Sequence, residues 1–135
     1  MTPLFAHAIA VLLLTGVIWT IQLINYPGFP DIEKRAWPPY HKRHSQRITI
    51  IVLPLMLTEL GTSGWLLWNE ITPFHIAFFA LALFNWIVTG VVFMPLHQRI
   101  VFRPTESSLQ RLTQLNWMRT FAWTTASILS VISIM

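Results

Sequence analysis

Long apolar stretches alternate with short polar connections along this chain, and the apolar stretches have nearly equal lengths. They cover residues 4–24, 48–68, 74–94 and 115–135. Each is close to the ~20 residues that a helix needs to cross a hydrocarbon layer about 30 Å thick. Because a backbone inside lipid must satisfy its own hydrogen bonds, the pattern predicts helices and not strands. The expected fold is all-α, an integral membrane four-helix bundle that forms a single domain over residues 1–135.

Local signals predict where these helices start and stop. Residues 25–30 read Asn-Tyr-Pro-Gly-Phe-Pro, which predicts that the first helix ends there. The second helix is expected to begin near Pro39, and Thr72 and Thr105 are the expected N-caps of the third and fourth. No basic residue precedes the first apolar stretch and no small-residue cleavage site follows it. That stretch is therefore expected to be retained as a helix, not removed as a signal peptide.

Composition narrows the classes of protein that fit. The chain is 54% hydrophobic and 10% charged, which excludes a disordered protein and disfavours a water-soluble domain. Seven Trp and nine Phe suit aromatic belts at the two membrane interfaces. The absence of Cys excludes disulfides, thiolate metal sites and thiol redox chemistry. The lipid bilayer is thus the first expected partner of this chain.

Basic side chains predict the orientation across the membrane. Of the nine Lys and Arg residues, all but Arg119 lie in the connections around residues 25–47 and 97–111. The connection at 69–73 has none. The positive-inside rule makes the two basic connections cytoplasmic, so both termini are expected to be extracytoplasmic, in a bacterial inner membrane. The same clustering explains the net charge of +4 without nucleic-acid binding.

Three polar residues within the apolar stretches are the candidate catalytic group. Glu59 is the one carboxylate inside such a stretch, and Asn116 and Arg119 share a face of the last helix. A charge at this depth needs a partner, so we expect Glu59 and Arg119 to contact each other. The contact has two interpretations. It is a structural clamp between helices, or it belongs to a site for protons or substrate.

Five histidines raise the question of a metal or a haem. His41, His44 and His97 are expected at the cytoplasmic side, where imidazoles suit Zn, Cu or Fe, although contacts with lipid phosphates explain the pattern equally well. His7 and His75 lie toward the outer ends of two helices and could clamp a b-type haem. Two ordinary interfacial histidines are the alternative there. The cofactor is thus open, with metal and haem both considered.

Tryptophans mark an expected pocket between the helices. Trp19, Trp86, Trp117 and Trp123 could line it, and Gln22 lies toward the cytoplasmic side. Trp117, Trp123 and Gln22 are the candidate cofactor-binding residues. In this hypothesis Glu59 exchanges protons while an arginine and an amide hold a quinone-like or phenolic oxygen.

Several short motifs together resemble a known group of proteins. The chain is similar to a family of small bacterial four-span membrane proteins, mostly uncharacterised, and more distantly to the unknown-function family that includes anthrone oxygenases. The resemblance covers nearly the whole chain. It implies a four-span fold and importance for His41, His44, His97, Glu59, Asn116 and Arg119. The motifs are Tyr26-Pro27-x-Phe29, Tyr40-His41-x-x-His44-x-x-Arg47-Ile48, Pro54-Leu55-Met56-Leu57-x-Glu59-Leu60, Pro95-Leu96-His97 and Asn116-Trp117-x-Arg119-Thr120.

Two functions therefore compete. The first is an oxidoreductase or oxygenase-like membrane protein that binds a lipophilic ring compound inside the bundle. The second is an accessory subunit of a larger membrane complex, docking through apolar helix faces to partner chains or pigments. A transporter is disfavoured because the chain has no repeated half and no row of pore-lining polar residues.

Overall fold

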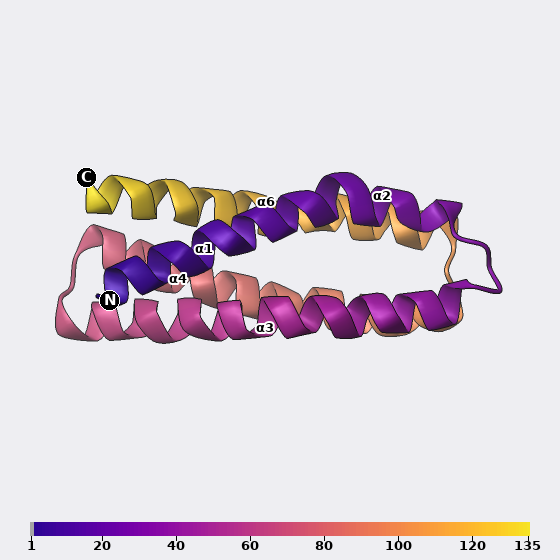
Figure 1. Cartoon of the computed structure of the whole chain (residues 1–135), viewed down its shortest axis with the longest axis horizontal. Coiled ribbons are helices and arrows are strands. Elements are labelled where there is room, and N and C mark those ends of the chain that lie inside the picture. The colour runs from indigo at the N-terminus through magenta and orange to yellow at the C-terminus, as the bar shows by residue number, and fades with distance from the viewer. Residues whose placement is uncertain (1) are drawn as a thin grey trace.

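The computed structural model describes residues 2–135 and is about 90% helical, with no strand among these residues. Four long helical segments follow one another along the chain (Figure 1). The second segment is one unbroken helix, α3 (Trp37–Asn69), and so is the fourth, α6 (Glu106–Ile134). The first and third are built from several pieces. These are α1 (Pro3–Thr20), η1 (Ile21–Asn25), α2 (Tyr26–Gly28) and η2 (Phe29–Asp31), then α4 (Pro73–Val88), η3 (Thr89–Phe93) and α5 (Met94–Phe102).

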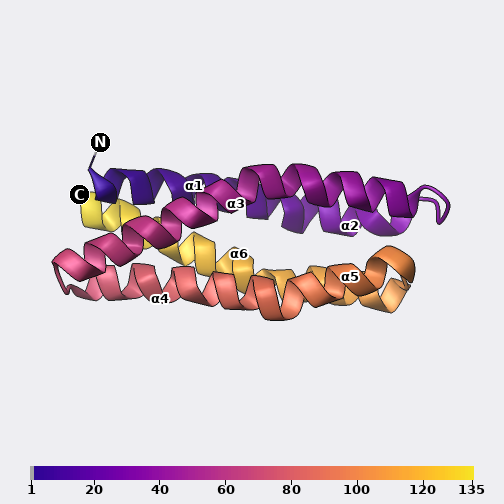
Figure 2. The same ribbon diagram turned by 90° about the horizontal axis from the view of Figure 1, so that it is seen from below.

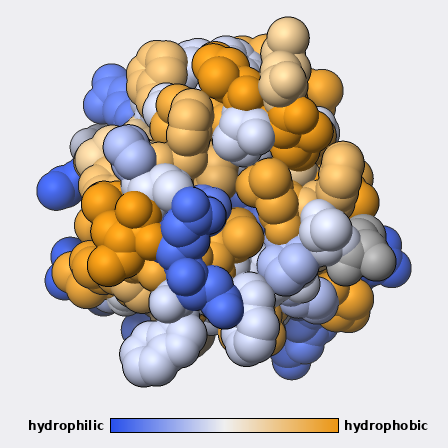
Figure 3. Space-filling model, turned by 90° about the vertical axis from the view of Figure 1, so that its left-hand side faces the viewer, coloured by the Kyte–Doolittle hydropathy of each residue, from blue (hydrophilic) through white to orange (hydrophobic). Residues whose placement is uncertain are grey.

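The four segments pack side by side in a closed order. α1 packs against α3 and α6, and α4 packs against the same two helices from the other side. Figures 1 and 2 show both termini at one end of the molecule, together with the α3–α4 turn. Most of the basic residues lie toward the opposite end, in the two turns there and in the adjoining parts of the helices. Figure 3 shows that apolar side chains cover much of the terminal end, with hydrophilic ones between them.

Three of these segments are long and apolar enough to cross a membrane: Pro3–Asp31, Trp37–Asn69 and Pro73–Phe102. The expectation of four such stretches is therefore met for three. α6 is long enough, but Ser, Thr, Asn and Arg interrupt its apolar sequence. The reason is its packing: the buried face of α6 includes Asn116, Arg119, Ser127 and Ser130.

The predicted N-caps are confirmed, whereas the predicted stop at residues 25–30 is wrong. Thr72 accepts a hydrogen bond from the His75 amide, and Thr105 forms a capping box with Ser108. Residues 25–30 instead continue the first segment as far as Asp31, and α3 begins at Trp37, two residues before Pro39.

Two π-helical turns explain why prolines fail to end these segments. η1 is followed closely by Pro27, and η3 by Pro95. A proline in a regular α-helix lacks the donor for its i−4 carbonyl, and its ring collides with that carbonyl. A π turn widens the helix locally and shifts the hydrogen-bond register, so the chain continues past the proline.

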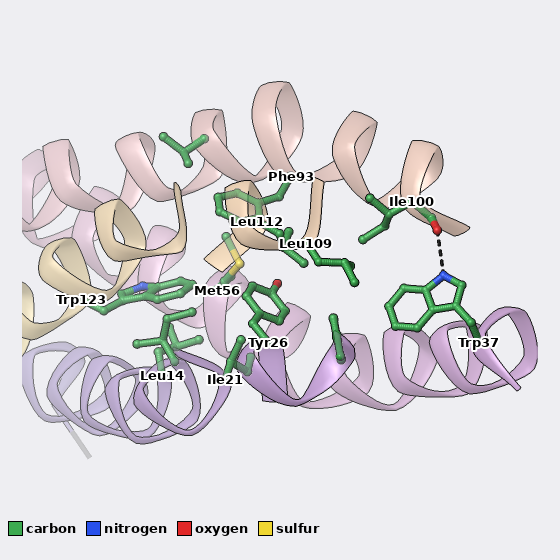
Figure 4. Packing of buried hydrophobic residues seen from close by; sticks show 13 residues of the cluster. Leu14, Ile21, Tyr26, Trp37, Met56, Phe93, Ile100, Leu109, Leu112 and Trp123 are labelled. Carbon is green, nitrogen blue, oxygen red and sulfur yellow. Dashed lines mark hydrogen bonds between the residues drawn. The ribbon is translucent and has the colours of Figure 1, made fainter. Parts of the chain in front are cut away.

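A buried apolar cluster holds the basic half of the molecule together. Trp37 lies almost fully buried at one end of it, where its Nε1 donates to the Ile100 carbonyl at 2.7 Å (Figure 4). Tyr26 lies in the middle of the cluster, and its ring points into the interior between segments (Figure 4). The same cluster packs beside the polar groups described next.

Candidate functional site: a buried arginine beside a lateral cavity

A cavity of about 560 Å³ lies between α3 and the third segment. α3 lines one wall with residues that include Met56, and η3 and α5 line the other with Phe93 and His97. Leu53 and Met94 also line it, although 42% and 56% of their surfaces are exposed. The cavity therefore opens sideways, toward the surface that lipid would cover.

Arg119 of α6 contributes the charge at the cavity wall. Its side chain is only 6% exposed. The guanidinium carbon lies 4.6 Å from the centre of the Phe93 ring and 5.1 Å from that of Trp123. Both distances suit cation–π contacts. Its Nε has no hydrogen-bond partner, so at least one donor of this group is unused within the described chain.

The expected contact between Glu59 and Arg119 is not formed. In residues 2–135 Glu59 Oε2 instead accepts a hydrogen bond from Trp123 Nε1 at 3.0 Å, and its Oε1 has no partner. Helix register explains the error. Glu59 and Trp123 lie at similar distances from the outer ends of α3 and α6, whereas Arg119 is one turn, or ~6 Å, farther from that end. The indole of Trp123 thus contacts both charged residues.

A chain of hydrogen bonds starts at the cavity and runs to the basic end. The Tyr26 hydroxyl and His97 Nε2 share one bond at 3.1 Å, and His97 Nδ1 and His41 Nε2 share the next at 2.9 Å. Tyr26 and His97 line the cavity, and His41 is buried behind them. Each bond can carry its proton on either partner, because a phenol and imidazoles both donate and accept. The arrangement can move a proton without moving a helix.

The candidate metal ligands are only partly brought together. His41 and His97 bond to each other, while His44 stacks on Tyr40 and also lines the cavity. Over the described residues, no group of three His, Asp or Glu side chains is arranged to hold a metal ion. A direct imidazole–imidazole hydrogen bond also uses the nitrogens that a metal would need.

The two outer histidines have other neighbours. His7 packs on Phe78 with ring centres 4.5 Å apart, and His75 lies 6.3 Å from the same ring. His75 Nδ1 also bonds to the Glu70 carbonyl at 2.7 Å. Phe78 thus contacts both rings that a haem would need, and this geometry does not present the two imidazoles as a haem clamp.

Gln22 and Asn116 bond to each other away from the cavity. Gln22 Oε1 accepts from Asn116 Nδ2 at 2.9 Å and from the Thr120 hydroxyl at 3.2 Å. Gln22 Nε2 donates to the Thr113 carbonyl at 3.0 Å. This network connects η1 to α6. Neither amide belongs to the cavity wall, so the structure separates Asn116 from Arg119, with which it was grouped.

The four tryptophans of the expected pocket also separate. Trp86 lines the cavity, and Trp123 contacts Arg119 from behind. Trp19 and Trp117 instead form an edge-to-face pair with ring centres 5.6 Å apart, and Trp19 Nε1 donates to Thr124. Trp117, a candidate cofactor-binding residue, therefore lies at the contact between α1 and α6 and not in the cavity.

Sequence reasoning missed two polar groups on the third segment. Asn85 is fully buried and neither of its amide atoms has a partner, and the Thr89 hydroxyl is likewise unpartnered within the described chain. Asn85 stands in the middle of an apolar stretch, and that isolation is a signal that could have identified it. Tyr26 gave no comparable signal. It reaches the cavity only because the π turn η1 lets the first segment stay helical beyond Asn25, and the sequence did not predict that turn.

Together these contacts define a candidate site. It consists of a lateral apolar cavity, a buried cation at its wall and a hydrogen-bonded chain leading away from it. Comparison of the chain with protein-family models, curated proteins and solved structures gave no match.

Proposed function

We propose that this protein binds a lipophilic ring compound with a polar oxygen, such as a quinone or a phenol, in the lateral cavity. We place it among oxidoreductase- or oxygenase-like membrane proteins. The observation that carries the proposal is Arg119, a buried cation without a carboxylate contact in the described residues, at the wall of an otherwise mainly apolar cavity.

The physical argument begins with the cost of burying the charge. A charged side chain within a membrane is retained where it meets a partner, a water-filled space or a ligand. Phe93 and Trp123 stabilise the guanidinium through their ring faces, but they do not accept its in-plane N–H groups. The Tyr26 hydroxyl lies close enough to interact with the guanidinium. A carbonyl or phenolate oxygen of a bound ring would accept the remaining N–H groups, and a charged donor makes such a bond stronger than a neutral one.

The Tyr26–His97–His41 chain supplies the second half of the proposal. A bound hydroquinone or phenol that reacts as its anion gives up a hydroxyl proton, and an oxygen beside Tyr26 or His97 has a route for that proton to the basic end. This arrangement assigns proton exchange to the tyrosine and histidines. Glu59, bonded to the far side of Trp123, has no such route to the cavity.

The proposed setting is a bacterial cytoplasmic membrane with both termini outside and the basic turns inside. The shared end of the two termini and the positive-inside rule support it. α6 is then the fourth segment to cross the bilayer, because it packs along α1 and α4 and buries its polar face against them. The four segments would form a membrane bundle around the cavity.

A binding titration with a short-chain benzoquinone or naphthoquinone tests the proposal. Quenching of tryptophan fluorescence should saturate in the wild-type protein in nanodiscs, because Trp86 lines the cavity. Arg119→Gln should weaken binding by at least tenfold, and Arg119→Lys should bind at an intermediate level, since it keeps the charge without the planar fork. Arg111→Gln, on the exposed side of the same helix, is the matched control.

Equal affinity of the wild-type protein and a folded Arg119→Gln variant would refute the arginine site. Absence of saturable quenching by any quinone or phenol probe would refute the ring-binding proposal. If the protein then co-purified stoichiometrically with another membrane chain, the accessory-subunit hypothesis would take its place. The exposed apolar side chains of α3 do not decide this, because lipid covers such surfaces equally well.

A further inference from the structure

We propose a second binding site, adjoining the lateral cavity along α3, for an anionic phospholipid. Its phosphate would lie against Arg43 and Arg47, and one acyl chain would follow the groove between α1 and α3. The two sites share His44 and Ile48 as lining residues but use different arginines, so the inference does not require that the cavity bind a ring compound.

The head-group part is a hollow of about 360 Å³ at the basic end. Arg43, His44, Arg47 and Tyr40 line it from α3, and Asn25 lines it from the first segment. The two arginines are four residues apart, so they lie on adjacent turns of one helix face. Among residues 2–135, no Asp or Glu lines this hollow. The hollow therefore offers two guanidinium forks and several neutral donors, a set suited to phosphate oxygens.

The chain part continues directly from the head part. A second groove of about 430 Å³ shares Asn25, Ile48 and Ile51 with the hollow and is otherwise lined by α1. Its lining residues from the first segment are mostly apolar: Leu12, Leu13, Gly16, Val17 and Thr20 of α1 and Ile21 of η1. Along α3 the lining changes from arginine and histidine to isoleucine within two turns. That order matches a phospholipid lying at an interface with its head at the basic end.

Gly16 keeps the groove open. A methyl group placed on Gly16 would meet no atom within 4 Å, so the space above it is free. A glycine that contacts nothing is not required for helix packing here. A larger side chain at this position would instead fill the groove from its floor.

The occupant follows from the two parts together. A free phosphate would use the arginines but not the apolar groove, and a neutral lipid would use the groove but not the arginines. The cytoplasmic leaflet holds anionic lipids, which attract clustered Lys and Arg at this level of the membrane. The continuous polar-to-apolar lining therefore favours an anionic phospholipid over either.

Native mass spectrometry of the full chain, with lipids added in detergent, tests the site. Phosphatidylglycerol should remain bound at one equivalent, with phosphatidylcholine retained at least fivefold less. Arg43→Gln combined with Arg47→Gln should abolish this preference. Lys42→Gln removes a charge from the same helix turn but from outside the hollow, and it should retain the preference.

Two further measurements distinguish a bound phospholipid from a bound inorganic phosphate ion. Gly16→Leu should reduce phosphatidylglycerol retention at least fivefold while leaving quinone binding in the lateral cavity unchanged. Inorganic phosphate at millimolar concentration should not displace the lipid. Equal loss of lipid in Lys42→Gln, or full retention in Gly16→Leu, would refute the site and leave only nonspecific attraction to basic residues. Displacement by inorganic phosphate alone would show a phosphate site without a lipid groove.

Discussion

Two helix contacts in this molecule contain buried polar side chains: the contact between α1 and α6, and the contact of α3 with the third segment. They differ in whether those side chains have hydrogen-bond partners. Along α1 and α6, the Thr15 hydroxyl donates to the Trp123 carbonyl at 2.9 Å and shares a bond of 2.7 Å with Ser127. Ser127 also bonds to the Val11 carbonyl, and Trp19 bonds to Thr124. Every one of these short side chains has a partner on the facing helix.

The other contact leaves polar atoms without partners. Asn85 has two, Thr89 one, and Glu59 and Arg119 one each, all within residues that the structure describes. Elsewhere in those residues, His7 Nε2 and Asn116 Oδ1 are also buried without a partner, one atom each. These groups are as deeply buried as those between α1 and α6, so burial alone does not distinguish the two regions.

The difference separates two roles for buried polar groups in a membrane. Paired hydroxyls and amides join helices, because each hydrogen bond replaces contacts that lipid cannot provide. Unpartnered groups cost free energy in the same surroundings and are expected where something else uses them. The α1–α6 contact is therefore the structural side of the molecule, and the cavity side is the functional one. Three experiments test this division.

The largest effect is expected from Gln22→Leu, on the structural side. Gln22 makes three hydrogen bonds to α6, and the substitution leaves buried Asn116 and Thr120 without that acceptor. We expect the free energy of unfolding to fall by about 2 kcal/mol, since each buried interhelical bond contributes roughly 0.6 kcal/mol and orphaned partners add to the loss. Unfolding in mixed detergent measures it.

Gln114→Leu is the control for that experiment, because Gln114 lies on the exposed surface of α6. It should change stability by less than about 0.5 kcal/mol. A similar loss in both variants would mean that the polar network of Gln22 does not join the helices. Quinone binding by the folded fraction of Gln22→Leu should remain within about twofold of wild type, because Gln22 does not line the cavity. A twofold change in affinity is well below the tenfold change that about 1.4 kcal/mol would produce.

A smaller effect of opposite sign is expected from Asn85→Leu, on the functional side. The amide of Asn85 is buried with neither atom paired, so an apolar side chain of similar size removes a polar group that has no partner. Stability should rise by about 1 kcal/mol, measured by the same unfolding assay. Gln46→Leu, at an exposed position of α3, should leave it unchanged. A clear loss of stability in Asn85→Leu would show that the amide is satisfied in the folded protein.

The amino-acid pattern was sufficient for the all-helical fold and for two helix starts. Thr72 and Thr105 act as N-caps because that preference depends only on a few neighbouring residues. It was not sufficient at residues 25–30, where a proline and a glycine normally end a helix. The π turn η1 keeps the segment helical there, and tertiary packing of buried Tyr26 and Phe29 supports it.

The candidate site shows the same limit at the level of side chains. Arg119 was identified from its charge alone, and it does lie at the cavity. Its partner was not identifiable, because Glu59 and Arg119 both belong to apolar stretches and their relative depth depends on where α3 and α6 end. A shift of one turn was enough to place Trp123 beside Glu59. Asn116 was grouped with Arg119 by helix face, but Gln22, far away in sequence, bonds to it.

The smallest expected effect is the coupling between Glu59 and Arg119, measured by a double-mutant cycle with Glu59→Gln and Arg119→Gln. A direct buried ion pair would give a coupling of several kcal/mol, because removing one charge leaves the other uncompensated. Here Glu59 contacts the indole nitrogen of Trp123, and Arg119 lies by the faces of Trp123 and Phe93. The Glu59 carboxyl group and the Arg119 guanidinium both contact Trp123 but do not bond to each other, so the coupling should be only about 0.5 to 1 kcal/mol. Trp123→Phe removes the indole donor while keeping an aromatic ring, and it should lower stability in the Glu59 background by more than in the Glu59→Gln background. A coupling above about 1.5 kcal/mol between Glu59 and Arg119 would instead require direct contact, and Arg119 would then lose its standing as the unpaired charge at the cavity.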